Sequence, residues 1–219
     1  MEQLNDDLST LKSLCAQQAL ELDPQALQKL VHYGDLLREW NQKINLISRK
    51  EDAPIIIKHI FHSLLIALHH SFKKDEKVLD LGTGGGLPGI PLAIAFPNAQ
   101  FMLVDATGKK ITACQEMIKE LGINNAVAVH MRVEELKGHL FDTVLSRQVA
   151  PLEQLCAYAG RVLKPNGKLI CLKGGNLNRE IAKAIESSKK HNGFPVKVVL
   201  YPINNITPFF SEKQIVIAC

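Results

Sequence analysis

The spacing of hydrophobic side chains divides the chain into two regions that meet near residue 72. In the first region, Leu27, Leu30, Val31 and Leu37 recur at helical spacing, and they follow the helix-start signal Asp23-Pro24. A second helix is expected over residues 54–70, where one face is strongly apolar. We therefore expect a helical N-terminal region over residues 1–72 and a second domain over residues 73–219.

From residue 73 onward, short apolar runs alternate with helix-like segments. Strands are expected at 78–81, 101–104, 126–129, 143–146 and 168–172, with helices at 91–96, 109–121 and 151–163 between them. This alternation predicts a doubly wound parallel sheet with helices on both faces.

The end of the chain departs from that alternation. After a helical segment at 179–190, two strand-like runs at 196–201 and 214–218 flank the turn-rich residues 202–208. They predict a closing antiparallel hairpin, because a parallel crossover needs a longer connection. The expected fold class is therefore α/β, with a Rossmann-like sheet of seven strands, the last one antiparallel, and a helical N-terminal extension.

The first expected strand runs directly into a glycine-rich loop. Five glycines occupy eight positions between Gly82 and Gly89, and Pro88 lies where a helix could begin. Without side chains, such a loop lets a ligand lie against bare backbone at a helix N-terminus. The loop is therefore expected to bind a nucleoside.

The glycine pattern alone does not identify that nucleoside. Gly82, Gly84 and Gly86 form a GxGxG series, whereas Gly84, Gly86 and Gly89 match the dinucleotide pattern GxGxxG. Asp105, at the end of the next expected strand, is placed to accept hydrogen bonds from ribose hydroxyls in either kind of ligand.

Two features favour S-adenosylmethionine over a dinucleotide. Asp80 would be unfavourable beside a pyrophosphate but could hold the ammonium group of a methionine, directly or through water. The expected terminal hairpin also suits a methyltransferase sheet. An NAD(P)-dependent oxidoreductase and an RNA-binding protein with a vestigial cofactor fold remain the alternatives.

Composition adds limited information. A net charge of +4 is compatible with an acidic partner such as RNA but is only a weak indication of one.

The apolar stretch 55–68 is interrupted by charged and polar residues, so no membrane span is expected, and the N-terminus lacks a signal pattern. The five cysteines include no CxxC pair, which favours reduced thiols in the cytoplasm. His59 and His62 lack further ligands at metal-site spacing, so no metal site is expected.

A wider set of motifs runs from about Trp40 to Gly174. They are Trp40-Asn41, Ile44-Asn45-Leu46, Lys58-His59-Ile60, Asp80-Leu81-Gly82-Thr83-Gly84-Gly85-Gly86-Leu87-Pro88-Gly89-Ile90-Pro91-Leu92, Arg132-Val133-Glu134-Glu135, Ser146-Arg147 and Leu172-Lys173-Gly174. In this order the motifs resemble those of one family, the bacterial small-subunit ribosomal RNA guanine-N7 methyltransferases, also called glucose-inhibited division protein B.

The resemblance implies methyl transfer from S-adenosyl-L-methionine to N7 of a guanine in 16S ribosomal RNA. It implies cofactor contacts for one group of residues, to which our own analysis adds Asp80, Gly84 and Asp105. That group is Gly82, Leu87, Val133, Glu134 and Arg147.

The implied chemistry needs no catalytic base, because N7 of guanine has a free lone pair and no proton to lose. Arg132 and Lys173 follow expected strands, and we expect Lys173 and at least one arginine to grip RNA phosphate. The expected partner is small-subunit ribosomal RNA or a ribosomal particle, and we expect a cytoplasmic monomer.

The chain departs from the family pattern at a few positions. His62 stands where the family usually has an acidic residue, and Gln148 where alanine is commoner. Gly85 often gives way to proline or alanine in the family. The first departure affects the hydrogen bonding expected of the second helix.

Overall fold

The computed structural model describes residues 2–48, 54–136, 138, 140–147, 149–190 and 193–219. Its strands form one mixed sheet in the order β3-β2-β1-β4-β5-β7-β6. The strands are β1 (Lys77–Leu81), β2 (Gln100–Asp105), β3 (Ala126–His130), β4 (Phe141–Arg147), β5 (Leu163–Gly174), β6 (Val198–Pro202) and β7 (Lys213–Ala218).

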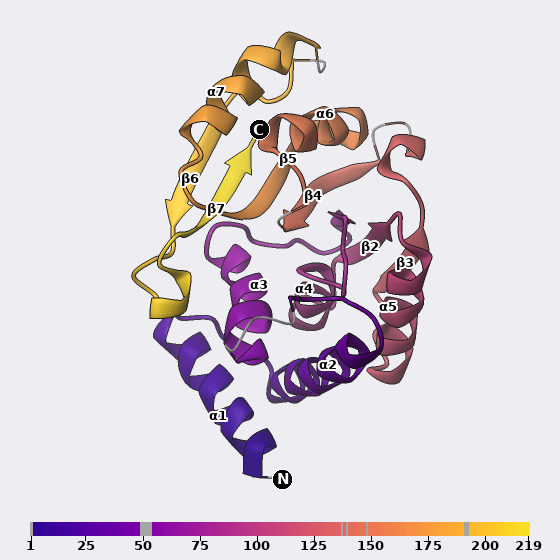
Figure 1. Cartoon of the computed structure of the whole chain (residues 1–219), viewed down its shortest axis with the longest axis vertical. Coiled ribbons are helices and arrows are strands. Elements are labelled where there is room, and N and C mark those ends of the chain that lie inside the picture. The colour runs from indigo at the N-terminus through magenta and orange to yellow at the C-terminus, as the bar shows by residue number, and fades with distance from the viewer. Residues whose placement is uncertain (1, 49–53, 137, 139, 148, 191–192) are drawn as a thin grey trace.

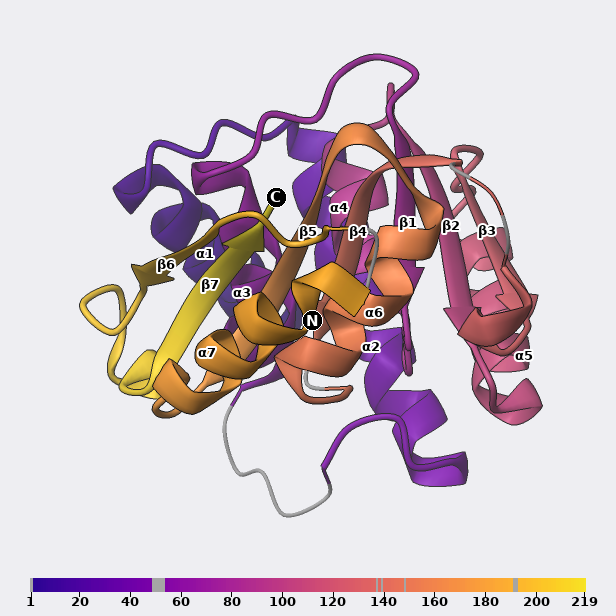
Figure 2. The same ribbon diagram turned by 90° about the horizontal axis from the view of Figure 1, so that it is seen from above.

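The strand directions match the prediction. Strands β1 to β5 pair in parallel, and β7 pairs antiparallel with both β5 and β6. In Figure 2 the arrow of β7 points opposite to the arrows of β1 and β2. The sheet with an antiparallel last strand is confirmed. Strand β5 is longer than expected and begins at Leu163.

Helices and short helical turns connect the strands. Figure 1 shows β3 and β6 near opposite ends of the sheet, with α1 at the bottom of the view. The α-helices are α1 (Glu2–Gln17), α2 (Pro24–Lys43), α3 (His62–Leu64), α4 (Gly89–Ala95), α5 (Gly108–Glu120), α6 (Leu152–Val162) and α7 (Asn178–Ser187); η1 (Ile56–Phe61) is a π-helix, and η2 (Leu65–Leu68), η3 (Val133–Glu135), η4 (Ser188–Lys190) and η5 (Pro208–Phe210) are 3-10 turns.

Alternating side chains of the strands supply two hydrophobic cores. Val78 of β1 belongs to the core beneath the N-terminal region, α4 and α5, whereas Leu79 belongs to the core beneath α6 and α7. A strand buried on both faces needs apolar residues at successive positions, and Val78 and Leu79 of β1 follow this pattern. Helices therefore cover both faces, as predicted.

The N-terminal region packs against the sheet. Leu11 of α1 and Leu30 of α2 share one core with Val78 and Ile90. Helix α2 begins as the sequence indicates, since the Asp23 side chain accepts a hydrogen bond from the Gln25 amide at 2.7 Å. Helix α1 had no element of its own in the prediction, which indicated only helical character there. The division at residue 72 stays a prediction.

The second helix of this region is less regular than expected. In place of one α-helix over 54–70, the chain forms a π-helix, one α-turn and a 3-10 turn. Its residues from His59 to Ile66 are all buried, so neighbours contact it on several sides. Its start carries the run Ile55-Ile56-Ile57, which is weakly helix-forming. Packing therefore decides its winding.

A buried polar cluster joins the N-terminal region to the sheet. Glu76 accepts hydrogen bonds from Thr143 of β4 at 2.7 Å and from the Lys73 amide at 2.8 Å, and it pairs with His70 at 2.7 Å. Burial acts to raise the pKa of the Glu76 carboxyl, but the three hydrogen bonds outweigh it and lower this pKa to about 2.

The variant Glu76→Gln should lower the free energy of unfolding by about 2 kcal/mol at pH 7, because it leaves buried partners poorly paired. Since the folded-state pKa lies below the unfolded value of 4.5, the wild-type advantage is present above pH 4.5. It should shrink as the pH falls from 4.5 toward 2. Urea denaturation at several pH values measures this difference in the free energy of unfolding, with a variant of the exposed Glu116, Glu116→Gln, as the control. A pH-independent difference would contradict this assignment.

Candidate functional site

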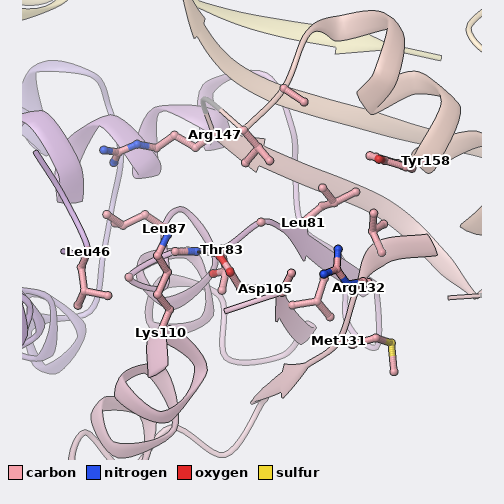
Figure 3. Close-up of a pocket in the computed structure, with 18 of the residues that line it drawn as sticks. Leu46, Leu81, Thr83, Leu87, Asp105, Lys110, Met131, Arg132, Arg147 and Tyr158 are labelled. Carbon is pink, nitrogen blue, oxygen red and sulfur yellow. Dashed lines mark hydrogen bonds between the residues drawn. The ribbon is translucent and has the colours of Figure 1, made fainter. Parts of the chain in front are cut away.

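A cavity of about 640 Å³ opens at the carboxyl ends of β1, β2, β3 and β4. Figure 3 shows Leu46 and Tyr158 on opposite sides of it, with Asp105 between them. Of the residues expected to bind a cofactor, seven line this cavity. They are Gly82, Gly84, Leu87, Asp105, Val133, Glu134 and Arg147.

The eighth, Asp80, lies beneath the glycine loop and not on the cavity wall. Its Oδ2 accepts hydrogen bonds from the Thr83 hydroxyl at 2.6 Å and from the Gly89 amide at 2.9 Å. Its side chain has no exposed surface. A direct contact with a ligand ammonium group is therefore corrected, whereas the contact through water stays a prediction; in the structure this carboxylate ties the two ends of the loop together.

Burial raises the pKa of Asp80 to about 6, although its two hydrogen bonds oppose that rise. The lack of space beside the carboxylate explains why position 89 holds a glycine, because a Cβ there would lie 2.7 Å from Asp80 Oδ2. No other residue type would let the chain pass this close to the carboxylate.

Gly82 begins the loop in a left-handed conformation, with φ of +70°. A Cβ at this position would lie 2.6 Å from Cγ2 of Val149. The amides of Gly82 and Thr83 both donate to the carbonyl of Val104 on β2, at 2.9 and 3.0 Å. The loop is therefore fixed to the neighbouring strand and leaves its glycine backbone facing the cavity.

Asp105 ends β2 beside this loop. Its Oδ2 accepts from the Gly84 amide at 3.0 Å and its Oδ1 from the Thr107 amide at 2.8 Å. Each oxygen retains a further lone pair, so the carboxylate can still accept from ligand hydroxyls. The position agrees with the ribose contact expected from the sequence.

A chain of hydrogen bonds lies at the side of the cavity formed by η3 and α6. Gln154 Nε2 donates to the Tyr158 hydroxyl at 2.7 Å, and that hydroxyl donates to Glu134 Oε1 at 2.8 Å. The pKa of Glu134 is lowered, first by a bond from its own backbone N–H and then by Tyr158. Glu134 is therefore a carboxylate held in one orientation, and Val133 precedes it on the same wall.

Gln154 and Tyr158 are not among the site residues predicted from the sequence. The only signal available is their separation of one helical turn, which puts them on one face of α6. Nothing in the sequence relates that face to Glu134.

Arg147 reaches the opposite side of the cavity from the end of β4. Its Nη2 donates to Nδ1 of His59, which lies on η1 and also lines the cavity. This contact joins the sheet to the N-terminal region at the site.

His62 is one of the positions at which the chain departs from the family pattern. Its ring stacks on Phe210 of η5 at 4.9 Å between centroids. Burial lowers the pKa of His62 well below 6.5, and the nearby charges of Arg147 and Lys213 add to this effect. The ring is therefore neutral and serves as an apolar partner for η5. Gln148, the other departure, lies outside the described residues.

The N-terminal region also packs against the glycine loop. The Tyr33 hydroxyl donates to the Gly85 carbonyl at 2.7 Å, and Leu37 fills the space that a Cβ on Gly85 would need. The Asn41 side chain accepts from the amides of Leu46 and Ile47, which line the cavity.

The two residues expected to bind RNA differ in placement. Arg132 is exposed and lines the cavity. Lys173 is only 8% exposed, and its Nζ pairs with Glu180 at 2.9 Å and donates to the Ala150 carbonyl at 2.9 Å. The expectation that Lys173 grips a phosphate is corrected, because its charge is already engaged within the protein.

The described part of the chain contains no helix that is long and apolar enough to cross a membrane. Within the same residues, no three or more His, Cys, Asp or Glu side chains gather as a possible metal site. All five cysteines are free, and only Cys219 is exposed.

A family model described as rRNA small subunit methyltransferase G matches residues 26–206 of the chain. Two relatives named Ribosomal RNA small subunit methyltransferase G are similar over nearly their whole length. That of Pelodictyon phaeoclathratiforme is 69% identical over 217 residues, which cover 99% of this chain and 95% of the relative. That of Chlorobaculum tepidum is 64% identical over 215 residues, which cover 98% and 99%.

Solved structures share the fold at low sequence identity. A SAM-dependent methyltransferase from Aquifex aeolicus has a TM-score of 0.58 at 17% identity, covering 78% of this chain and 95% of that one. The fibrillarin of Aeropyrum pernix, solved with natively bound S-adenosyl-L-methionine, has a TM-score of 0.54 at 14% identity, covering 73% and 74%. The methyltransferase type of sheet is therefore confirmed.

Two glycine variants test how tightly the loop is packed. Gly82 and Gly122 both have positive φ, at +70° and +59°, but a Cβ on Gly122 meets nothing within 4 Å. Gly122→Ala should therefore cost about 1 kcal/mol of stability through backbone strain alone. Gly82→Ala should cost more, because Val149 must also move. Thermal unfolding of the pair measures the difference, and equal losses would show that Val149 does not pack against Gly82.

Proposed function

Because the chain belongs to the family of ribosomal RNA small subunit methyltransferase G, we propose that it transfers a methyl group from S-adenosyl-L-methionine to N7 of a guanine in 16S ribosomal RNA. The observation that carries the proposal is the bare glycine loop, which shares one cavity with the carboxylates of Asp105 and Glu134. The family match gives no support to an NAD(P)-dependent oxidoreductase or to an RNA-binding protein with a vestigial cofactor fold.

The cavity fits the methyl donor. Gly82, Gly84 and Leu87 would support its methionine part, and Asp105 would accept hydrogen bonds from the ribose hydroxyls. Val133 and Glu134 would bind the adenine, whose exocyclic amine is a donor suited to a carboxylate. Arg147 would balance the charge of the methionine carboxylate. Asp80 would hold the loop from beneath and would reach the ammonium group of the ligand only through water.

S-adenosyl-L-methionine supplies an electrophilic methyl group, and guanine N7 attacks with a free lone pair. The chain therefore has to position two molecules and accommodate a change of charge, and it needs no proton acceptor. Alignment of the reacting atoms can contribute about 7–11 kcal/mol to such a reaction. We assign no catalytic base.

Ribosomal RNA would approach from the open side of the cavity, where Arg132 is exposed. We propose that Arg132 contacts RNA phosphate and that the chain acts as a monomer in the cytoplasm. Its substrate would be small-subunit ribosomal RNA or the ribosomal particle that contains it.

Labelled S-adenosyl-L-methionine tests the function directly. Purified protein should transfer label to small-subunit particles, or to 16S ribosomal RNA freed of protein, when either lacks the modification. Strand scission specific for N7-methylguanine should then map the label to one nucleotide. Calorimetry should show binding of S-adenosylhomocysteine and none of NADH. Absence of label in every form of the substrate would falsify the proposal.

Tyr158→Phe tests the part played by Glu134. Removing the hydroxyl frees the carboxylate to rotate, so the Kd for S-adenosylhomocysteine should rise by about 2- to 10-fold. The Kd for S-inosylhomocysteine, which lacks the exocyclic amine, should change much less. Tyr201→Phe, whose ring stacks on His69 away from the cavity, is the matched control. Equal losses for both ligands would argue against an adenine contact by Glu134.

A further inference from the structure

A second cavity, of about 480 Å³, adjoins the first one. The two share Val149 and Ala150 in their walls. The second cavity lies where β5 ends at Gly174 and β7 begins at Lys213, next to the residues that follow β4. A ligand in it would therefore lie beside a ligand bound over the glycine loop.

Val149 forms the boundary between the two cavities. Its side chain packs against Gly82, yet 43% of the residue is exposed. An exposed aliphatic side chain beside the glycine loop offers an apolar surface against which a planar base can pack.

The charged groups of the second cavity fall into two sets. Lys173 and Glu180 pair with each other at 2.9 Å, and Glu180 also accepts from the Leu152 amide. By contrast, no described residue forms a hydrogen bond or ion pair with the side chains of Glu212 and Lys213. Only this second set is available to a ligand.

The backbone that carries Glu212 and Lys213 is held in place. The Gly175 amide donates to the Glu212 carbonyl at 2.9 Å, and Gln214 Nε2 donates to the Gly175 carbonyl at 2.6 Å. Gly174 allows close approach, since a Cβ there would lie 3.3 Å from the Glu212 carbonyl oxygen. A carboxylate on a fixed backbone can select a ligand by geometry.

We propose that this second cavity receives the guanine to be methylated and that the Glu212 carboxylate binds its Watson–Crick edge. The proposal rests on the proposed function. Among the four RNA bases, only guanine presents two adjacent donors, N1–H and the N2 amino group, on that edge. A carboxylate accepts both at once through its two oxygens.

The chemistry gives this contact a catalytic consequence. The lone pair of N7 forms a bond to the methyl carbon as the carbon–sulfur bond breaks, and the electron pair of that bond stays on sulfur. Sulfur becomes a neutral thioether, the purine becomes a cation, and no proton leaves. The positive charge makes N1–H a stronger donor, so the bond to Glu212 strengthens in the transition state.

Lys213 has a different role, because an ammonium group beside the purine would destabilise the positive charge that develops on the base. We assign Lys213 to a contact with a phosphate of the target nucleotide. This is the role that the sequence suggested for Lys173, which is buried. Lys213→Met should reduce the slope of log Kd against log salt by about 0.7 for a single-stranded contact.

Glu212→Gln is the first test, because it removes the charge and one acceptor while keeping the size. The kcat for small-subunit particles should fall by about 10- to 100-fold, with a much smaller change in KM. The Kd for S-adenosylhomocysteine should not change. Glu186→Gln, on the exposed face of α7, is the matched control and should resemble the wild type.

A base substitution separates guanine recognition from a structural effect. Inosine at the target position lacks the N2 amino group, so the wild type should methylate it more slowly than guanosine. Glu212→Ala should methylate guanosine and inosine at similar rates. If Glu212→Ala retains the wild-type rate on guanosine, or the full preference over inosine, the inference is overturned. If the wild type itself transfers no label, the proposed function fails instead.

Discussion

One buried carboxylate fixes the conformation of the glycine loop, and the site depends on it. Asp80 Oδ2 accepts hydrogen bonds from the Thr83 hydroxyl and the Gly89 amide, so the turn after β1 and the start of α4 are held by the same oxygen. Burial of a carboxylate is costly, and the raised pKa of Asp80 reflects that cost. The two hydrogen bonds of Asp80 to the loop offset part of that cost.

The N-terminal region completes the site in addition to packing on the sheet. Tyr33 bonds to the glycine loop, Asn41 holds the segment that contains Leu46, and His59 contacts Arg147. The contacts of Tyr33 and His59 join segments that are far apart in sequence. Within the family signature, His59 lines the cavity and Asn41 holds Leu46 and Ile47, which line it, so a fragment that begins at residue 73 would lack this part of the wall.

Carboxylates line both of the cavities that the proposed reaction would use. Asp105 and Glu134 line the first, where the proposed ligand carries a sulfonium group and an ammonium group. Glu212 stands in the second, where the positive charge would move. Lys173, buried against Glu180, contributes no net charge to this path. The proposed transfer needs no proton acceptor, because guanine N7 has a free lone pair and no proton to lose.

The sequence by itself determined the sheet, because alternating buried strands and helices permit few other folds, and it located the loop through the density of its glycines. It also placed Asp105 correctly, since strand ends in a parallel sheet lie at one edge. Only the tertiary structure decided that Asp80 faces inward, that Lys173 is paired with Glu180, and that Tyr158 orients Glu134. These outcomes depend on how side chains of different elements pack together, and the spacing of residues along a chain does not show which side chains come into contact.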